Sequence, residues 1–525
     1  MCDSGILLYN AMKRYFFIVV IVFKYVLVAA GVVGVLAFLA VAYARMDYPY
    51  ELEWMEGGAV DHVMRVVSGQ PLYVRPSLVF TPFIYTPLYF YLSGLLSLAT
   101  GVGFLPLRLV STLASLGCMA LIFEFVRRES GSSFSGAAAA GLFAACFKVG
   151  GAWYDMGRAD MLFLALALGA IYALRFYPGT RGALWAALLG WLAFMSKQTA
   201  LIVMVPLCLA RLREGRGSGR FVFPAALAAL VGGSTLAYNA LSGGWFAYYI
   251  FDLPGRHALH FDMLPDVLTV DLFFLLPGMA FLALVYAFSL LAGRRAQQRP
   301  GDLLFHLMAA AGLVGAGVSG RIHAGGYVNV LIPAFAGAAI YAGLGLHVLL
   351  ERAGIPGGLN VVKDARAAAP TGALTALAAL GLLAGLGQFW LLRYPPLAQI
   401  PGRADQAAGD ALVEMVAAVD GEVYIPYHGY LAALAGKTTQ AQGMALEDVF
   451  RSSDEEGRDV LKAEIREAIQ GRRFAAIILD GEWRFMAEIE ANYSYAGPIF
   501  EDEDVFWPAT GMPTRPQRLY LVRTE

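Results

Sequence analysis

Long apolar stretches without charged residues are the feature that most constrains how this chain can fold. A run of about 18 or more such residues is long enough for a helix that crosses the hydrocarbon core of a membrane. The sequence predicts eleven spans of this kind, at about residues 15–43, 106–126, 134–150, 160–176, 183–196, 198–212, 221–242, 271–292, 302–319, 326–350 and 370–392.

The composition agrees with a membrane protein and divides the chain in two. Of the 525 residues, 58% are hydrophobic and 15% are charged, whereas soluble domains average about 25% charged residues. This excludes a soluble single-domain enzyme, a disordered chain and a nucleic-acid binder. The formal net charge of −1 sums a basic part before Tyr394 and an acidic part from it onward. We therefore expect a transmembrane domain over 1–393, with an external loop over 44–104, and an external soluble domain over 394–525.

The distribution of Lys and Arg predicts the orientation of the spans, because cytoplasmic loops are enriched in both residues. Basic residues gather in the connections after the second, fourth, sixth, eighth and tenth predicted spans. Placing these connections and the amino terminus in the cytoplasm leaves one apolar stretch, 83–101, without a crossing. We expect this stretch to lie in the outer membrane interface with helical structure; a twelfth span is the alternative.

The residues after Pro396 have the composition of a soluble domain. Helical patterns are expected near 405–419 and 446–470, and strand-like runs near 422–426, 474–480 and 518–523. Alternating strands and helices predict a small α/β domain. This tail contains no Gly-rich phosphate loop and no nucleophile elbow, and His428 within it is expected to be a surface turn residue.

An acidic segment follows the first predicted span and is the first candidate site. It contains Glu53 and Glu56, which would lie on one face of a helix because they are three residues apart. A carboxylate in such a position suits general-base activation of a hydroxyl group. Acid clusters are also common in solvated loops, so this motif does not establish a site by itself.

A second candidate lies in the next predicted external loop, with the sequence WYDMGRAD at 153–160. Asp160 opens an apolar helix, and ionisable residues at membrane helix ends are functional candidates. The alternatives are structural, because a carboxylate at a helix start often caps the helix. Arg158 and Asp155 could also simply pair with each other.

Cationic side chains are predicted on the same face of the membrane. Lys197 lies in a turn between two short spans, where it could bind a lipid phosphate or only extend toward the headgroups. Further along the chain, a set of basic and aromatic residues favours an anion site, although each histidine alone would usually be structural. The set comprises Arg256, His257, His260, Arg321, His323 and Tyr327.

Acidic and cationic groups that converge at the outer leaflet suit one reaction in particular. A carboxylate removes the proton of an acceptor hydroxyl, and the hydroxyl displaces a lipid-linked phosphate from C1 of a sugar. Lys and Arg stabilise the leaving phosphate electrostatically. Direct displacement with one base inverts the anomeric centre, and a donor that arrives in the membrane needs no nucleotide-binding loop.

A series of short motifs then resembles the GT-C superfamily of integral-membrane glycosyltransferases, with a pattern similar to lipid A aminoarabinose transferase and protein O-mannosyltransferases. The resemblance covers roughly 15–340, and the order of its motifs is more specific than any one of them. After the acidic loop these motifs are SGQPLY (68–73), YTPLYFYLSG (85–94), RLVSTLASLGCMALIFEFVRR (108–128), GRADMLFLALAL (157–168) and MSKQTALIVMVP (195–206).

The resemblance implies a polyprenyl-phosphate sugar donor, inversion, and a catalytic carboxylate in the first external loop. The family commonly has Asp-Glu at that position, whereas this chain has Met55-Glu56. The base is therefore left between Glu56 and Glu53, with a preference for Glu56. The second acidic position falls on Asp160 and the phosphate-binding lysine on Lys197. Some relatives bind a divalent metal such as Mg or Mn and others none, so the resemblance assigns no cofactor.

Two alternative functions are weighed against a glycosyltransferase. A lipid-linked glycan ligase or polymerase would call for more external cations, and a transporter or flippase would call for charges through the membrane depth and inverted repeats. The acceptor is left open among lipid, glycan and protein. The pattern of basic loops and the absence of an ER-retention signal favour a bacterial inner membrane, with the amino terminus cytoplasmic and the tail periplasmic.

Overall fold

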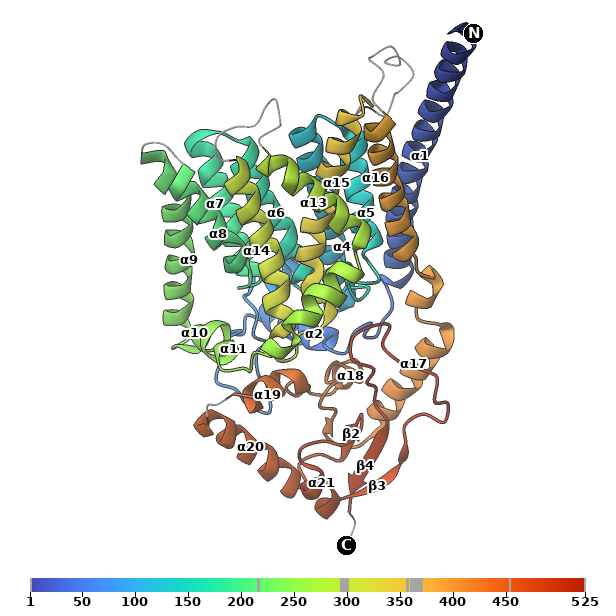
Figure 1. The fold of residues 1–525 in the computed structure, drawn as a ribbon. Helices are drawn as coiled ribbons and strands as arrows, with labels where there is room; N and C mark the ends of the chain where they lie inside the picture. Colours follow the sequence, from blue (N-terminus) through green and yellow to red (C-terminus); the bar gives the residue numbers. More distant parts are fainter. Residues whose placement is uncertain are drawn as a thin grey trace.

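The structure is a computed structural model that describes residues 2–214, 218–292, 302–355, 358, 372–452 and 455–523. Basic residues that the sequence analysis assigns to cytoplasmic connections at 216, 294–299, 363 and 366 lie outside the described residues. The described chain is mostly helical, and Figure 1 shows a bundle of long helices with the last part of the chain packed against one end.

The bundle and the short helices at its ends account for the chain up to residue 391. Their bounds are α1 Cys2–Arg45, α2 Glu56–Val67, α3 Leu88–Thr100, α4 Phe104–Ser130, α5 Ser133–Ala145, α6 Asp160–Phe176, α7 Gly179–Ser196, α8 Ala200–Glu214, η1 Ser218–Phe221, α9 Val222–Leu241, α10 Trp245–Ala247, η2 Tyr248–Asp252, α11 Leu253–Gly255, η3 Phe261–Met263, α12 Leu264–Asp266, η4 Val267–Phe274, α13 Pro277–Leu291, α14 Asp302–Ile322, η5 Val328–Leu331, α15 Ile332–Arg352 and α16 Gly372–Leu391.

Each of the eleven predicted spans contains a helix, but the helices differ in length. Six helices of the described chain are long and apolar enough to cross a membrane, and a seventh crossing is possible if the pair bent by 93° between Phe274 and Pro277 is one span. The other four are α5, α6, α7 and α8, which have 13, 17, 18 and 15 residues. The chain is therefore a multi-pass membrane protein, while the count of eleven stays a prediction.

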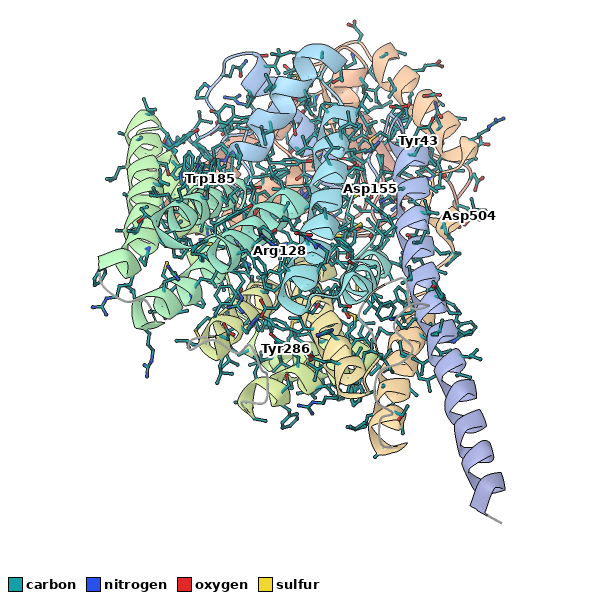
Figure 2. All side chains as sticks on the ribbon, turned by 90° about the horizontal axis from the view of Figure 1, so that it is seen from above. Tyr43, Arg128, Asp155, Trp185, Tyr286 and Asp504 are labelled. Atoms are coloured by element: carbon teal, nitrogen blue, oxygen red, sulfur yellow. The ribbon has the colours of Figure 1, made fainter. Side chains whose placement is uncertain are left out.

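Small residues let neighbouring helices approach closely, as is common where helices pack in membranes. At the crossing of α1 and α5, a Cβ added to Gly31 would lie 3.2 Å from the Cα of Gly141. Large apolar side chains stay exposed on the outer surface, such as Tyr43 on α1 and Trp185 on α7, which are 87% and 54% exposed (Figure 2). This surface suits contact with lipid tails.

The stretch 83–101 forms a helix too short to be counted among the long apolar helices. It is α3, with 13 residues, and it packs against α2, α4 and α7. Its position at the membrane interface stays a prediction. Together with the loop over residues 46–55, which we call the first loop, α2 and α3 lie near the end of the bundle that faces the last part of the chain.

The residues from 394 onward, which we call the C-terminal segment, form helices and one sheet. The four strands have the order β1-β2-β4-β3, in which β1 and β2 are parallel and the other pairs are antiparallel. The bounds are η6 Pro396–Gln399, α17 Arg403–Ala418, β1 Val423–Tyr424, α18 Tyr430–Leu434, α19 Gly443–Phe450, α20 Glu455–Gln470, β2 Ala476–Leu479, α21 Met486–Asn492, β3 Tyr493–Pro498 and β4 Arg518–Val522.

These elements match the sequence patterns in part. Helix α17 and strands β1, β2 and β4 lie within or close to the predicted ranges, whereas the helix expected over 446–470 is divided into α19 and α20. Strand β3 was not predicted. Whether the segment is a separate domain stays a prediction.

Candidate functional site

A cavity of about 730 Å³ lies where the bundle meets the C-terminal segment. Its walls come from the first loop, the turn at 153–160, the start of α8, the end of α14 and the residues that lead into α15. The C-terminal segment adds residues of α19 and the turn at 511–513. Segments far apart in the sequence therefore enclose one space.

Glu53 of the first loop lines this cavity and is buried. Its Oε2 accepts a hydrogen bond of 3.1 Å from Nη1 of Arg158. Burial raises the pKa of the Glu53 carboxyl to about 7, even though the Arg158 guanidinium lowers it. A carboxylate with a pKa near neutrality is suited to act as a general base at neutral pH.

Asp160 and Lys197 form an ion pair in the wall of the same cavity. The Lys197 Nζ donates a hydrogen bond of 2.7 Å to Oδ1 of Asp160. The indole Nε1 of Trp153 donates to Oδ2 at 3.1 Å, and Nδ2 of Asn329 donates to Oδ1 at 3.3 Å. Asp160 is the first residue of α6, but within the described residues its carboxylate binds these three side chains and caps no backbone N–H of the helix.

Tyr85 lies between the two ion pairs. Nη2 of Arg158 donates to its hydroxyl at 2.9 Å, and Nζ of Lys197 lies 5.5 Å from the centre of its ring. The cations of both pairs thus meet at one aromatic ring. The sequence placed Tyr85 only within an aromatic motif, without a role.

Glu56 occupies a different position from Glu53. It is the first residue of α2, is fully buried, and accepts a hydrogen bond of 2.8 Å from Nη2 of Arg108 on α4. The backbone N–H groups of Leu52 and Gly157 donate to it at 2.8 and 2.6 Å. Burial raises the pKa of the Glu56 carboxyl, but Arg108 outweighs burial and holds it below the usual value. Glu56 is not among the residues that line the cavity.

Asp155 likewise binds inside the protein rather than in the cavity. Its Oδ2 accepts a hydrogen bond of 2.7 Å from Nε of Arg45, the last residue of α1. In Figure 2 Asp155 lies inside the bundle beside α1. Asp155 and Arg158 therefore do not pair with each other. Asp155 binds Arg45, and Arg158 binds Glu53. Arg45 and Arg108 carry no signal in the sequence beyond their place at the ends of apolar helices.

The basic set after residue 250 is only partly at the cavity. His323 and Tyr327 line it, and the ring of Tyr327 lies 5.8 Å from that of Trp153. Arg321 donates to Asp271 at 3.0 Å and to the backbone of Gly326. The remaining members, Arg256, His257 and His260, are not among the residues that line the cavity.

The C-terminal segment is hydrogen-bonded directly to the first loop. Nε2 of Gln442 donates to the carbonyl of Trp54 at 3.1 Å. The backbone N–H of Thr510 donates to the carbonyl of Leu52 at 3.1 Å, and its hydroxyl donates to the carbonyl of Gly151. Thr510 thus joins the loop that carries Glu53 to the loop that leads to Arg158.

Gly511 shows how close this contact is. Its φ of +82° favours glycine, and a Cβ at this position would lie 2.8 Å from Cγ of Glu53. The turn at 511–513 therefore fits directly against the Glu53 side chain.

His428 is buried instead of lying in a surface turn. Its Nδ1 contacts Oε2 of Glu51 in the first loop, and its Nε2 contacts Oδ2 of Asp480 at 2.9 Å. Burial lowers the pKa of the His428 imidazole, but Asp480 and Glu51 outweigh burial and raise it to about 10. The sequence expectation is wrong here because the C-terminal segment folds onto the first loop and brings together groups more than 370 residues apart.

No metal site is apparent in the described part of the chain. No group of three or more His, Cys, Asp or Glu side chains there could hold a metal ion. The two acidic groups nearest each other in the cavity wall, Glu53 and Asp160, each have a cationic partner already. We therefore assign no step to a metal.

Comparisons with known proteins bear on the family and the fold of the chain. Residues 84–237 match the family described as dolichyl-phosphate-mannose-protein mannosyltransferase. These residues include Tyr85, Arg158, Asp160 and Lys197, all of which contribute to the cavity. The search of curated proteins finds no match.

Two solved structures share the fold over most of their length. ArnT from Cupriavidus metallidurans bound to undecaprenyl phosphate has a TM-score of 0.56 and 14% identity, over 93% of this chain and 97% of that one. The oligosaccharyltransferase of Archaeoglobus fulgidus in complex with zinc and sulfate has a TM-score of 0.51 and 12% identity, over 90% and 72%. The chain therefore has the fold of the GT-C glycosyltransferases, and the resemblance drawn from its sequence motifs is confirmed.

Proposed function

We propose that this protein is an inverting glycosyltransferase that moves a monosaccharide from a polyprenyl-phosphate carrier to an acceptor at the outer face of the membrane. One observation carries the proposal. A single cavity contains a buried carboxylate with a pKa near 7, Glu53, and two cations, Arg158 and Lys197, that meet at Tyr85.

The chemistry follows from these groups. Glu53 takes the proton of the acceptor hydroxyl as its oxygen forms a bond to C1 of the sugar. The bond between C1 and the phosphate oxygen breaks, and its electron pair leaves with the phosphate. Lys197 and Arg158 stabilise the charge that develops there. Since the acceptor attacks from the face opposite the phosphate, the anomeric configuration inverts.

Glu53 takes the role of base in this proposal, although the sequence slightly favoured Glu56. Glu56 is held by Arg108 and two backbone N–H groups away from the cavity. It positions the start of α2 and the backbone at Gly157, next to Arg158. Asp160 orients Lys197 toward the leaving phosphate.

An apolar side of the cavity supports a lipid carrier. Side chains of Phe163, Ile202, Ala316 and Val330 line it between α6, α8, α14 and η5. These helices lie in the part of the chain that we expect in the membrane. The ArnT structure with the same fold binds undecaprenyl phosphate, which is a carrier of the kind that such a surface suits.

The same proposal includes the topology. We place eleven spans across a bacterial inner membrane, with the amino terminus in the cytoplasm and the C-terminal segment in the periplasm. This places the cavity at the periplasmic surface, because it lies where the bundle meets that segment. His323 and Tyr327 belong to the cavity wall in this scheme, whereas Arg256 and Arg321 are not among its lining residues and are given no direct contact with the donor phosphate.

The decisive test is an assay of the purified protein with a panel of polyprenyl-phosphate monosaccharides and candidate acceptors. We expect one donor to be consumed, with a product of inverted configuration at C1. Loss of this activity in Glu53→Gln, measured on protein that is still folded, would support the assignment of the base. Consumption of no donor in the panel, or a product that retains the configuration at C1, would contradict the proposal.

A further inference from the structure

Asp448 differs from the other carboxylates in the cavity wall. Three carboxylates line the cavity, and two of them have cationic partners: Glu53 binds Arg158 and Asp160 binds Lys197. Asp448 is only 3% exposed. Within the described residues, no hydrogen bond or close ion pair reaches its side-chain oxygens.

Burial raises the pKa of the Asp448 carboxyl to about 7, and the charges of Arg451 and Arg158 offset only part of this effect. Buried polar groups in native proteins are hydrogen-bonded in the great majority of cases, and a buried charge without partners opposes folding. An exception in the wall of a cavity has a direct explanation, because a bound molecule supplies the missing hydrogen-bond donors.

Helix α19 holds Asp448 firmly at this place. The side chain of Gln442 accepts a hydrogen bond of 2.6 Å from the N–H of Met444 and caps the helix start. From the bundle, Nε2 of His257 donates to the carbonyl of Asp448 at 2.9 Å. The backbone at Asp448 is therefore fixed in position before any ligand binds, which lowers the entropic cost of recognition.

Arg451 lies one helical turn after Asp448 and also lines the cavity. No ion pair involving its guanidinium is formed in the part of the chain that the structure describes. A guanidinium offers only donors, and an ionised carboxylate offers only acceptors. A ligand that satisfies both must carry donors and acceptors close together. The hydroxyl groups of a sugar ring do so, because each hydroxyl both donates and accepts.

We propose that Asp448 and Arg451 form a carbohydrate-binding subsite, in which Asp448 accepts hydrogen bonds from sugar hydroxyls and Arg451 donates to neighbouring oxygens. The inference rests on the proposed glycosyl transfer and adds a role for the C-terminal segment in that reaction. The sugar ring is either the one transferred from the donor or one that belongs to a glycan acceptor, and the same chemistry serves both.

The test compares Asp448→Asn with Glu447→Gln. Glu447 is the neighbouring residue, pairs with Arg484 at 3.0 Å outside the cavity, and serves as a matched control. Without substrate, we expect Asp448→Asn to raise the melting temperature, because it removes a buried carboxyl whose desolvation Arg451 and Arg158 offset only in part. A structural role for Asp448 would have the opposite effect, so a lower melting temperature would overturn the proposal.

Ligand binding then distinguishes the two sources of the sugar. Undecaprenyl phosphate and its sugar-linked form are added separately, and the gain in melting temperature is measured for each. If the donor sugar occupies the subsite, Asp448→Asn loses the extra gain from the sugar but keeps the gain from undecaprenyl phosphate, and the donor KM rises about 10- to 100-fold. If an acceptor glycan occupies it, only the acceptor KM rises by this factor.

The outcomes separate this proposal from the proposed function. Unchanged KM values for both substrates and an unchanged gain from the sugar would overturn the subsite while leaving glycosyl transfer intact. If the unsubstituted protein consumes no donor, the proposed function fails. In that case, a gain in melting temperature from neither sugar-linked lipid nor free glycan would overturn the subsite too.

Discussion

Helix α6 carries a buried charge cluster at each of its ends, and the two clusters differ in one respect. At its start, Asp160 binds Lys197 in the wall of the cavity. In its last turn, Arg175 donates to Glu129 at 2.7 Å and to Asp302 at 2.6 Å. The helix has 17 residues, so the clusters are about 25 Å apart at a rise of about 1.5 Å per residue.

The charge cluster around Arg175 lies outside the cavity wall. Nε2 of His306 lies 3.0 Å from the hydroxyl of Tyr286 and 3.3 Å from Oε1 of Glu129. None of these residues lines the cavity at the opposite end. Ion pairs with little exposure therefore join helices at one end and line a cavity at the other. The adjacent space, and not the buried charge, is what marks a candidate site.

The largest expected effect tests the cavity end. Glu53→Gln removes the base while keeping the size of the side chain, so transfer should fall by about 10²- to 10⁴-fold. The melting temperature should also fall, because Arg158 loses its buried counter-charge, so the rate is compared per amount of folded protein. Rate assays with a saturating donor measure this directly.

Glu56→Gln is the matched variant for this prediction. It weakens the pair with Arg108, and we expect a lower melting temperature together with a smaller loss of rate than in Glu53→Gln. Full activity in Glu53→Gln would assign the base to another carboxylate.

Substitution of Arg175, at the other end of α6, should lower stability and leave the rate of transfer unchanged. Arg175→Gln removes the guanidinium that pairs with Glu129 and Asp302, and breaking a buried ion pair typically costs about 3–5 kcal/mol. We expect a strong loss of stability against heat or denaturant, with an unchanged kcat for the protein that remains folded. A fall in kcat without a loss of stability would show that the two ends are coupled during the reaction.

The pH dependence of the transfer rate should come from Glu53 in the cavity wall. Glu53 acts as a base only when ionised, and burial raises the pKa of its carboxyl to about 7. The value of kcat/KM should therefore rise about tenfold per pH unit below pH 7 and level off above it. Glu53→Gln should lose this dependence in its residual activity. A flat profile between pH 5 and 8 in the unsubstituted protein would contradict the assignment.

The smallest effect concerns the contact between the C-terminal segment and the cavity end. Thr510→Val removes the hydroxyl that binds the carbonyl of Gly151, at a cost of about 1 kcal/mol for one buried hydrogen bond. Because Thr510 joins the loops that carry Glu53 and Arg158, we expect kcat to fall several-fold with little change in donor KM. Thr510→Ser keeps the hydroxyl and should restore the rate. Equal losses in both variants would show that packing of the methyl group is what matters.

The sequence predicted the parts of this molecule that depend on local pattern. Apolar runs located the helices, and the requirement for one orientation placed Asp160 and Lys197 on the same face. The choice between Glu53 and Glu56 could not be made this way, because it depends on Arg108, which is 52 residues from Glu56 and binds it in the folded chain. Two carboxylates three residues apart look alike until their partners are known.

The position of Asp448 at the cavity could not be predicted from the sequence for a related reason. It lies in a short, largely apolar helix with the sequence GMALEDVF, and its position at the cavity results from the docking of the C-terminal segment on the first loop. Strand β3, with the sequence YSYAGP, was missed because it alternates poorly and contains Gly and Pro, which disfavour strands. It pairs with β4 nevertheless, through a ladder with an irregular register.

The bond between Gln442 and the carbonyl of Trp54 also bears on the order in which the protein is made. These residues are 388 positions apart. At synthesis rates of about 5–20 residues per second, the ribosome reaches Gln442 about 20–80 s after Trp54. The first loop must wait that long for the side chain that binds the carbonyl of Trp54. A chain released early from the ribosome would therefore contain most of its membrane helices but no closed cavity.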